Sequence, residues 1–143
     1  MSVRVIAGIF GGRKIETPEG KRTHPMAERV RNALFNSIGG EVEGARVLDV
    51  FAGSGAIGIE ALSRGALHVT FVERDRVAQQ VIAENIALLG IEERAKLVKA
   101  SVAAWASTYD GELFDLIFVD PPYHDPQFST AMQISGLLKP GAL

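Results

Sequence analysis

The chain has 143 residues, of which 47% are apolar and 22% charged, and a formal net charge of −2. It contains no cysteine, which excludes disulfide frameworks, cysteine-ligated zinc and cysteine nucleophiles. No apolar run approaches the roughly 20 residues that span a bilayer, and the first residues lack a signal-peptide core, so we expect one soluble, cytoplasmic protein of ordinary globular composition.

The small net charge conceals an uneven distribution of charged side chains. Residues 1–35 hold seven basic and three acidic residues, a net charge of +4, whereas residues 36–143 hold eight basic and fourteen acidic ones, a net charge of −6. A basic segment on an acidic body is typical of contact with a polyanion, although a solvated N-terminal extension would give the same pattern. The candidate phosphate contacts in this segment are Arg13, Lys14, Arg29 and Arg31.

Residues 1–40 predict a small extension made of a β-hairpin and a helix. Short apolar stretches over residues 3–6 and 13–15 flank a pair of glycines, which favours two strands joined by a turn. Residues 26–38 predict a helix that a second pair of glycines ends. The apolar residues on one face of this helix are Val30, Leu34, Phe35 and Ile38.

From Arg46 onward, strands alternate with helices. A helix over residues 55–65 follows the first strand, and a longer helix, capped by Asp75 and ended by Gly90, follows the second. The predicted strands cover residues 46–51, 68–73, 96–100 and 113–120. This alternation predicts a Rossmann-like α/β fold in residues 41–143, with a doubly wound, mostly parallel sheet.

The C-terminal residues predict a sheet that is not complete. Residues 128–138 have a helical pattern, and residues 138–143 have the pattern of a turn that leads into another strand. We therefore expect this chain to lack the later strands of a longer domain.

A glycine-rich turn joins the first of these strands to its helix. Gly53, Gly55 and Gly58 form a GxGxxG pattern, in which glycines permit a sharp turn and let a ligand lie against the backbone. Glu73 ends the next strand, where a carboxylate can accept hydrogen bonds from both hydroxyls of a ribose. The turn fits a dinucleotide, with its pyrophosphate at the helix end, or S-adenosylmethionine, whose cationic methionine end suits Asp49. A turn without a ligand would carry the same glycines.

The tetrapeptide Asp120-Pro121-Pro122-Tyr123 directly follows the fourth strand. In an open α/β sheet the loops after the first and fourth strands lie together, where the strand order reverses. The prolines fix the Asp120 carboxylate and the Pro121 carbonyl, and two fixed acceptors favour the positive charge that develops on an exocyclic amine as it attacks a methyl carbon. Tyr123 offers a flat face on which a flipped-out base can stack.

The segments VLDVFAGSGAIGIEALSRGA, FVERD and LIFVDPPY resemble the RsmD-type RNA guanine-N2 methyltransferases. The N-terminal segments RVIAGIFGGRKIETPEG and RVRNALFNSIG are similar to that family's own extension. The resemblance implies a class I methyltransferase fold, S-adenosylmethionine as methyl donor and the N2 amine of a guanine in 16S ribosomal RNA as acceptor. It also implies the assembled small ribosomal subunit as substrate. The reaction needs no metal, and we expect a monomer that binds no membrane.

The same resemblance implies roles for particular residues. Those that would bind the cofactor are Asp49, Phe51, Gly53, Ser54, Gly55, Glu73 and Ser101, and those that would hold the target base are Asp120, Pro121 and Tyr123. Ser101 stands in the loop that should meet the adenine, where many methyltransferases have an acid instead. The chain departs from the family's N-terminal pattern at His24, Met26 and Ala27, while Arg29 and Arg31 match it.

Three other functions share parts of this pattern. Similar tetrapeptides serve enzymes that methylate adenine or cytosine in DNA, or a glutamine amide in a protein, and the basic extension favours RNA over a protein substrate. A chain without later strands could bind RNA or cofactor without catalysis. A dinucleotide oxidoreductase would share the glycine turn, although none of the three histidines stands out as a base for hydride transfer.

Overall fold

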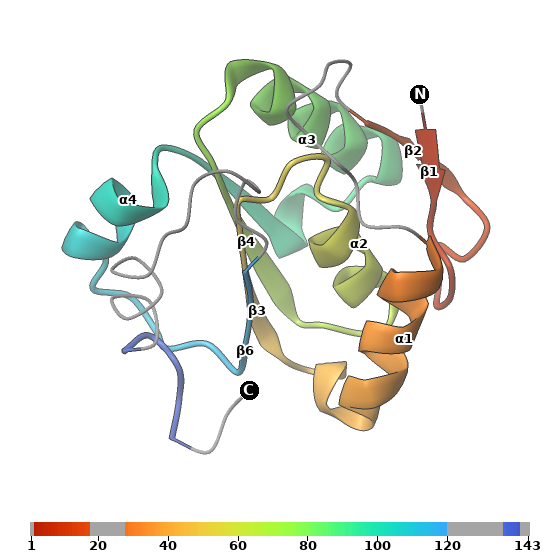
Figure 1. Cartoon of the computed structure of the whole chain (residues 1–143), viewed down its shortest axis with the longest axis horizontal. Coiled ribbons are helices and arrows are strands. Elements are labelled where there is room, and N and C mark those ends of the chain that lie inside the picture. The colour runs from red at the N-terminus through yellow and green to blue at the C-terminus, as the bar shows by residue number, and fades with distance from the viewer. Residues whose placement is uncertain (1, 18–27, 120–135, 141–143) are drawn as a thin grey trace.

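The computed structural model describes residues 2–17, 28–119 and 136–140 (Figure 1). Near the N-terminus, β1 (Ser2–Arg4) and β2 (Lys14–Glu16) pair antiparallel, with Val3 opposite Ile15. The hairpin that the sequence predicts is therefore present. Only Ile15 of β2 is buried, because successive residues of a strand face opposite sides.

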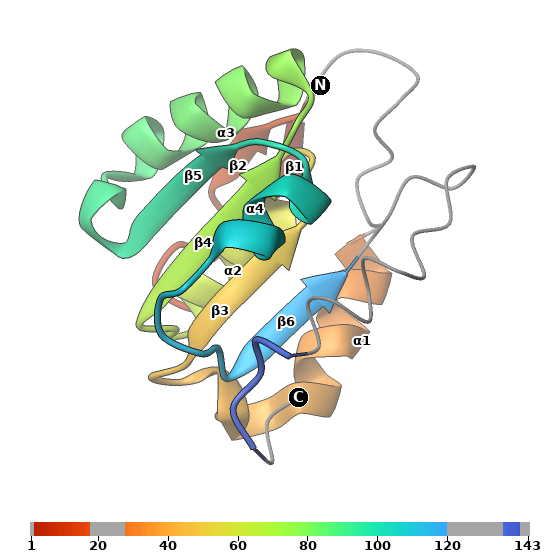
Figure 2. The ribbon, with the colours of Figure 1, turned by 90° about the vertical axis from the view of Figure 1, so that its left-hand side faces the viewer.

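A second sheet of four parallel strands forms the centre of the molecule. Its order is β5-β4-β3-β6, so the chain builds outward from β3 and then crosses to the other side of β3 to add β6 (Figure 2). The strands are β3 (Arg46–Val50), β4 (His68–Glu73), β5 (Ala95–Lys99) and β6 (Leu116–Val119). The predicted Rossmann-like, doubly wound parallel sheet is confirmed, with its strand order reversing between β3 and β6.

Helices cover both faces of this sheet. Figure 2 shows α4 in front of the strands and α2 behind them, on the side of the hairpin. The helices are α1 (Glu28–Ile38), α2 (Ala56–Ser63), α3 (Arg76–Leu89) and α4 (Val102–Thr108), with short 3-10 helices η1 (Gly39–Val42) and η2 (Glu92–Arg94). Within the described ranges, no helix combines the length and apolarity that a membrane span requires.

The ends of α3 follow from its sequence. The Asp75 carboxylate accepts a hydrogen bond from the backbone N–H of Ala78 at 2.9 Å, which satisfies a donor of the first turn. At the other end Gly90 adopts a left-handed backbone with φ of 65°, which glycine permits without steric strain. Both predicted ends of this helix are confirmed.

Two hydrophobic clusters lie on opposite faces of the sheet. The larger one joins the hairpin residues Val5 and Ile15 and Phe35 of α1 to the sheet residue Val47. The smaller one lies beneath α4 and contains Phe114, against which Trp105 and Tyr109 pack. Because the larger cluster runs through both, residues of the hairpin, of α1 and of the sheet share one core.

Two details of the predicted helices are wrong. Val30 is 50% exposed, and the face of α1 toward the core carries Arg31 at 1% exposure beside Phe35. In the predicted helix 128–138, Gly136 and Leu137 form a turn instead, while residues 128–135 lie outside the described residues. Leu138 then forms a parallel bridge to Phe114, just before β6.

Candidate functional site

The carboxyl ends of the parallel strands bring the residues predicted to bind the cofactor to one edge of the sheet. In register, Val50 of β3 lies between Val72 of β4 and Val119 of β6. The turn that starts at Phe51 therefore begins beside the end of β4, where Glu73 is the last residue. Asp120, Pro121 and Tyr123 follow β6 in the sequence, but they lie outside the described residues.

The glycine turn after β3 has an unusual backbone. Gly53 and Gly55 have φ of 60° and 82°, in the left-handed region that glycine occupies readily. Phe51 has φ of 57° and is the one non-glycine residue in the described ranges with a positive φ. Left-handed backbone at such a residue costs about 1–2 kcal/mol and is typically retained where a binding site requires it.

Gly58 serves packing instead of the turn itself. A Cβ atom on Gly58 would lie 2.3 Å from Cε1 of Phe71 and 2.8 Å from a methyl group of Val69. Only a glycine therefore lets α2 lie this close to β4 at this point. Gly53 and Gly55 permit the sharp turn, and Gly58 permits the close contact of helix and strand, as the GxGxxG pattern predicts.

Asp49 lies under the turn and binds the helix that follows it. Its side chain is 2% exposed, and Oδ2 accepts a hydrogen bond from the N–H of Gly58 at 3.1 Å. Asp49 therefore fixes α2 against β3. The predicted contact of its carboxylate with the methionine end of a cofactor stays a prediction.

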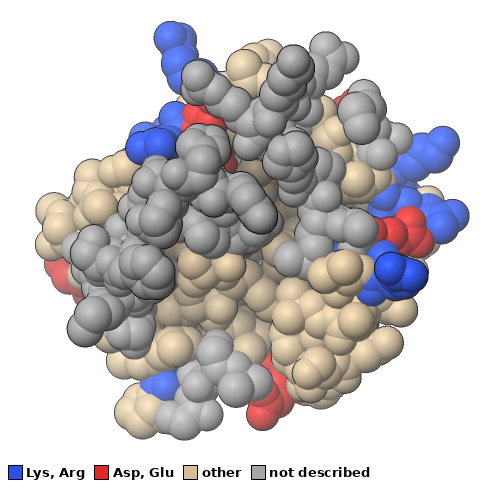
Figure 3. Space-filling model, in the orientation of Figure 1, with Lys and Arg blue, Asp and Glu red and all other residues tan. Residues whose placement is uncertain are grey.

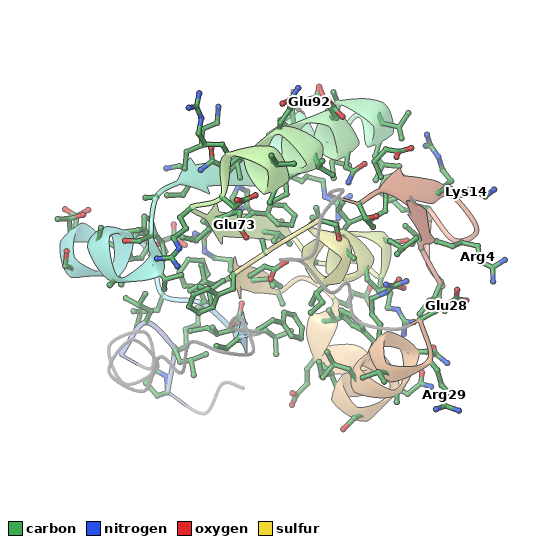
Figure 4. All side chains as sticks on the ribbon, turned by 45° about the horizontal axis from the view of Figure 1, so that its top comes forward. Arg4, Lys14, Glu28, Arg29, Glu73 and Glu92 are labelled. Carbon is green, nitrogen blue, oxygen red and sulfur yellow. The ribbon has the colours of Figure 1, made fainter. Side chains whose placement is uncertain are left out.

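Glu73 connects the end of β4 to the glycine turn. One carboxylate oxygen accepts the N–H of Gly53 and the other accepts the N–H of Asp75, both at 2.8 Å. The side chain is half-buried at the carboxyl edge of the sheet (Figure 4). Each oxygen keeps acceptor capacity beyond its one backbone bond, so this carboxylate can hold hydroxyl groups that lie against the turn.

The two predicted serines accept backbone hydrogen bonds at the starts of helices, and Ser101 is the N-cap of α4. Ser54 is 5% exposed, and its hydroxyl accepts the N–H of Ala56 at 3.2 Å in the first turn of α2. Ser101 precedes α4, and its hydroxyl accepts the N–H of Ala104 at 3.2 Å. Both serines lie after strands at the carboxyl edge, but their predicted contacts with a cofactor stay predictions.

Exposed basic residues in the described part of the N-terminal segment lie on one side of the molecule. Figure 3 shows Lys and Arg side chains on the right of the molecule, and Figure 4 labels Arg4, Lys14 and Arg29 on that side. Lys14 and Arg29 are exposed and point away from the body (Figure 4), and neither has an ion pair with any described residue. Arg13 is also exposed, but its guanidinium donates to the carbonyl of Leu88 at 3.3 Å.

Arg31 does not belong to this surface. Its side chain is 1% exposed, and its guanidinium lies 3.6 Å from the carboxylate of Glu60 and donates to the carbonyl of Arg4. Glu60 is itself fully buried on α2, where an ionised carboxylate requires cationic and hydrogen-bonding partners. The prediction that Arg31 contacts phosphate is therefore wrong, because its side chain is buried and its charge faces the carboxylate of Glu60.

The described groups with a shifted pKa lie at the opposite, amino edge of the sheet. Burial lowers the pKa of His68 at the start of β4, and the charges of Arg46 and Lys96 lower it further. The pKa of Asp115 is lowered, first by the hydrogen bond from the backbone N–H of Arg46. These shifts follow from contacts between neighbouring strand ends, away from the candidate site.

Two buried polar residues, Glu60 and Asn85, were not predicted from the sequence. Glu60 holds Arg31 and the hairpin, and Asn85 of α3 binds both the hairpin and the glycine turn. Glu60 stands between the buried residues Ile59 and Ala61 in the sequence, and Asn85 stands between Ile82 and Ile86. Each is therefore a polar residue among buried apolar ones. That pattern indicates a buried polar contact, although its partners are far apart in sequence.

Comparison with known proteins identifies the family of this chain. A family model described as "Conserved hypothetical protein 95" matches residues 3–143. The chain is 38% identical over 121 residues to "Ribosomal RNA small subunit methyltransferase D" of Escherichia coli K12, covering 85% of this chain and 60% of that protein. It is 36% identical over 149 residues to the protein of the same name from Haemophilus influenzae, covering 99% of this chain and 76% of that protein.

Solved structures show the same fold. A hypothetical protein of Thermus thermophilus is 31% identical, with a TM-score of 0.85 over 96% of this chain and 80% of that one. The Rossmann-like fold is thus that of class I methyltransferases. Because a family model matches residues 3–143 and the two relatives are 38% and 36% identical to it, the chain belongs to the RsmD family, described as Conserved hypothetical protein 95.

Proposed function

We propose that this protein transfers a methyl group from S-adenosylmethionine to the N2 amine of a guanine in 16S ribosomal RNA. The observation that carries this proposal is the bond between Glu73 and Gly53, which holds a carboxylate against a left-handed glycine turn. That arrangement lies at the carboxyl edge of a sheet whose strand order reverses there. Relatives named as methyltransferases of the ribosomal RNA small subunit support the reaction and the substrate class.

The residues of the turn fit S-adenosylmethionine better than a dinucleotide. The cofactor supplies, when bound, a methyl group on a cationic sulfonium. The buried Asp49 carboxylate lies under the turn, which favours a cation and disfavours a pyrophosphate. Glu73 can accept hydrogen bonds from ribose hydroxyls while it keeps its bonds to Gly53 and Asp75.

For the acceptor, we assign the tetrapeptide that follows β6. The Asp120 carboxylate and the Pro121 carbonyl would accept the two N–H groups of the guanine amine and orient its lone pair. These acceptors bind the amine more strongly as it gains positive charge, so they favour the transition state over the bound substrate. Tyr123 would stack on the base and keep it in place.

Transfer of a labelled methyl group tests the proposal directly. Small ribosomal subunits from a strain that lacks the gene are incubated with the protein and labelled S-adenosylmethionine, and the RNA is digested and mapped by mass spectrometry. We expect N2-methylguanosine at one position of 16S RNA. Label on adenine or cytosine, or on a protein glutamine, would assign the site to another amino group. Thermal stabilisation by NAD but not by S-adenosylmethionine would contradict the cofactor.

Replacement of Glu73 by alanine should weaken binding of S-adenosylhomocysteine by about tenfold to 100-fold, because bonds from ribose hydroxyls to a charged acceptor are lost. Isothermal titration calorimetry measures the affinity. Glu92→Ala removes the same charge from an exposed position beyond the far end of α3 and should leave the affinity unchanged. Equal affinity in Glu73→Ala and wild type would exclude Glu73 as a ribose ligand.

Binding of ribosomal RNA should fall steeply with salt although the protein is acidic overall, because Lys14 and Arg29 replace counterions on phosphates. Replacement of both by glutamine should lower the slope of log affinity against log salt by roughly 1.5 to 2. Filter binding at several salt concentrations measures the slope. Lys96→Gln on β5 removes an exposed cation away from this surface and serves as the control. An unchanged slope in the double variant would place the phosphate contacts elsewhere.

A further inference from the structure

A buried amide connects the N-terminal hairpin to the glycine turn. Asn85 lies on α3 with no exposed surface. Its Oδ1 accepts the N–H of Glu16 at 2.9 Å, and its Nδ2 donates to the carbonyl of Glu16 at 2.9 Å and to the carbonyl of Ser54 at 3.1 Å. One side chain therefore binds residues that are 69 and 31 positions away in the sequence.

The two partners of Asn85 belong to different parts of the proposed function. Glu16 is in β2, close to Lys14 on the basic surface. Ser54 lies between Gly53 and Gly55, in the turn assigned to the cofactor. By bonding both backbone groups of Glu16, the amide takes the place of a neighbouring strand for this residue. It also fixes the direction of a carbonyl in the turn.

The hydrogen bonds of Asn85 restrict how far β2 and the glycine turn can shift relative to α3. A buried amide has one oxygen acceptor and two N–H donors, and here all three have backbone partners. A shift of β2 relative to α3 would break two of them, and a shift of the turn would break the third. Since each buried group would then lack a partner, such shifts are unfavourable unless the parts move together.

We propose that Asn85 is a positioning residue that couples the basic hairpin to the cofactor-binding turn. The proposal rests on the function proposed above, in which these two parts bind RNA and S-adenosylmethionine. It implies that a ligand seated on the turn also holds β2 more firmly, and that loss of the amide loosens both parts at once. If Asn85 contributed to stability alone, its replacement would not specifically weaken the binding of either ligand.

Two variants and one matched control separate these roles. Asn85→Asp keeps the size and the acceptor for the N–H of Glu16, but it turns an acceptor toward the two carbonyls. Asn85→Ala removes all three bonds without adding charge. Ser63→Ala is the control: Ser63 is 2% exposed and binds the hairpin loop through the carbonyl of Ala7 and the N–H of Phe10, at 2.5 and 2.9 Å, and both of these partners lie outside the glycine turn.

The first measurement is hydrogen–deuterium exchange of the wild-type protein with and without S-adenosylhomocysteine. We expect saturating ligand to slow exchange in the peptide that contains Glu16, as well as in the turn over residues 51–58. In both Asn85 variants the ligand should no longer slow exchange at Glu16, and both peptides should exchange faster without ligand. Ser63→Ala should speed exchange in the hairpin loop only. Ligand-independent exchange at Glu16 in the wild type would overturn the proposal.

The second measurement is the affinity for S-adenosylhomocysteine by calorimetry. Asn85→Asp and Asn85→Ala should each bind it about tenfold more weakly. Ser63→Ala should bind it with wild-type affinity, even if its Tm falls as much as the Tm of the Asn85 variants. Equal losses in all three variants would assign Asn85 to stability alone. If the wild type itself binds no S-adenosylhomocysteine, the proposed function fails, and exchange without ligand still shows whether Asn85 holds both segments.

Discussion

Replacement of Asp120 by alanine should lower the rate of methyl transfer by about 100-fold or more while S-adenosylhomocysteine still binds with wild-type affinity. The expectation follows from the position of Asp120 in the sequence, directly after β6. β6 pairs with β3 in register up to Val119, so β6 ends beside the start of the glycine turn, and Asp120 is the next residue in the sequence. A carboxylate at that point can act on the acceptor amine without being a ligand of the cofactor.

The effect of Asp120→Ala is measured in two assays on the same preparation. Single-turnover transfer to small ribosomal subunits reports the chemical step, and calorimetry reports cofactor affinity. Asp110→Ala removes an exposed carboxylate from the loop after α4 and should leave both values unchanged. A full rate in Asp120→Ala would remove the tetrapeptide from the proposed mechanism, and a parallel loss of cofactor affinity would move Asp120 to the cofactor side.

Replacement of Glu60 by alanine should lower the free energy of unfolding by about 3–5 kcal/mol, because it removes the buried carboxylate that faces the charge of Arg31. Glu60 also accepts the N–H groups of Ile6 and Ala7 at 2.9 and 3.1 Å, and the guanidinium of Arg64 at 2.8 Å. One carboxylate thus holds α1 and the hairpin loop on α2. For a chain of this length, such a loss lowers the Tm by roughly 10 °C.

Glu28→Ala is the matched control for this prediction. Glu28 pairs with Arg4 at 3.0 Å, but both side chains are about half exposed, at 48% and 57%. Exposed pairs of this kind contribute between 0 and about 1 kcal/mol. Urea unfolding followed by circular dichroism compares the two variants. Similar small losses in both would show that the interior does not depend on the Glu60 charge.

The fold follows from the sequence pattern because each strand of the sheet carries its own signal. β4 occupies the predicted residues 68–73, and the limits of α3 at Asp75 and Gly90 depend on contacts within a few residues. α4 was not predicted, since seven residues with one buried position give too short a period to recognise. Local rules thus account for the elements that have strong caps or long apolar runs.

The candidate site was predictable in position but not in its contacts. Sequence order places the glycine turn and Glu73 at one edge of a parallel sheet, and the structure adds that they bind each other directly. Arg31 shows why charge alone is insufficient. It stands among exposed cations in the sequence, whereas in the structure its side chain is buried and faces the fully buried Glu60, 29 residues further along.

The reversed order of the strands has a consequence for how this protein folds. β3 pairs with β4, and β4 pairs with β5, so each of these pairs joins strands that are consecutive in the sheet and are connected by one α-helix. β6 pairs with β3 instead, through contacts such as that of Arg46 with Asp115, 69 residues apart. Closing so long a loop has a larger entropic cost than pairing neighbouring strands, so we expect β6 to join a sheet that already exists. The glycine turn and the end of β6 would therefore meet only in the last step of folding. In a chain that is still being synthesised, the glycine turn would form well before β6 is present beside it.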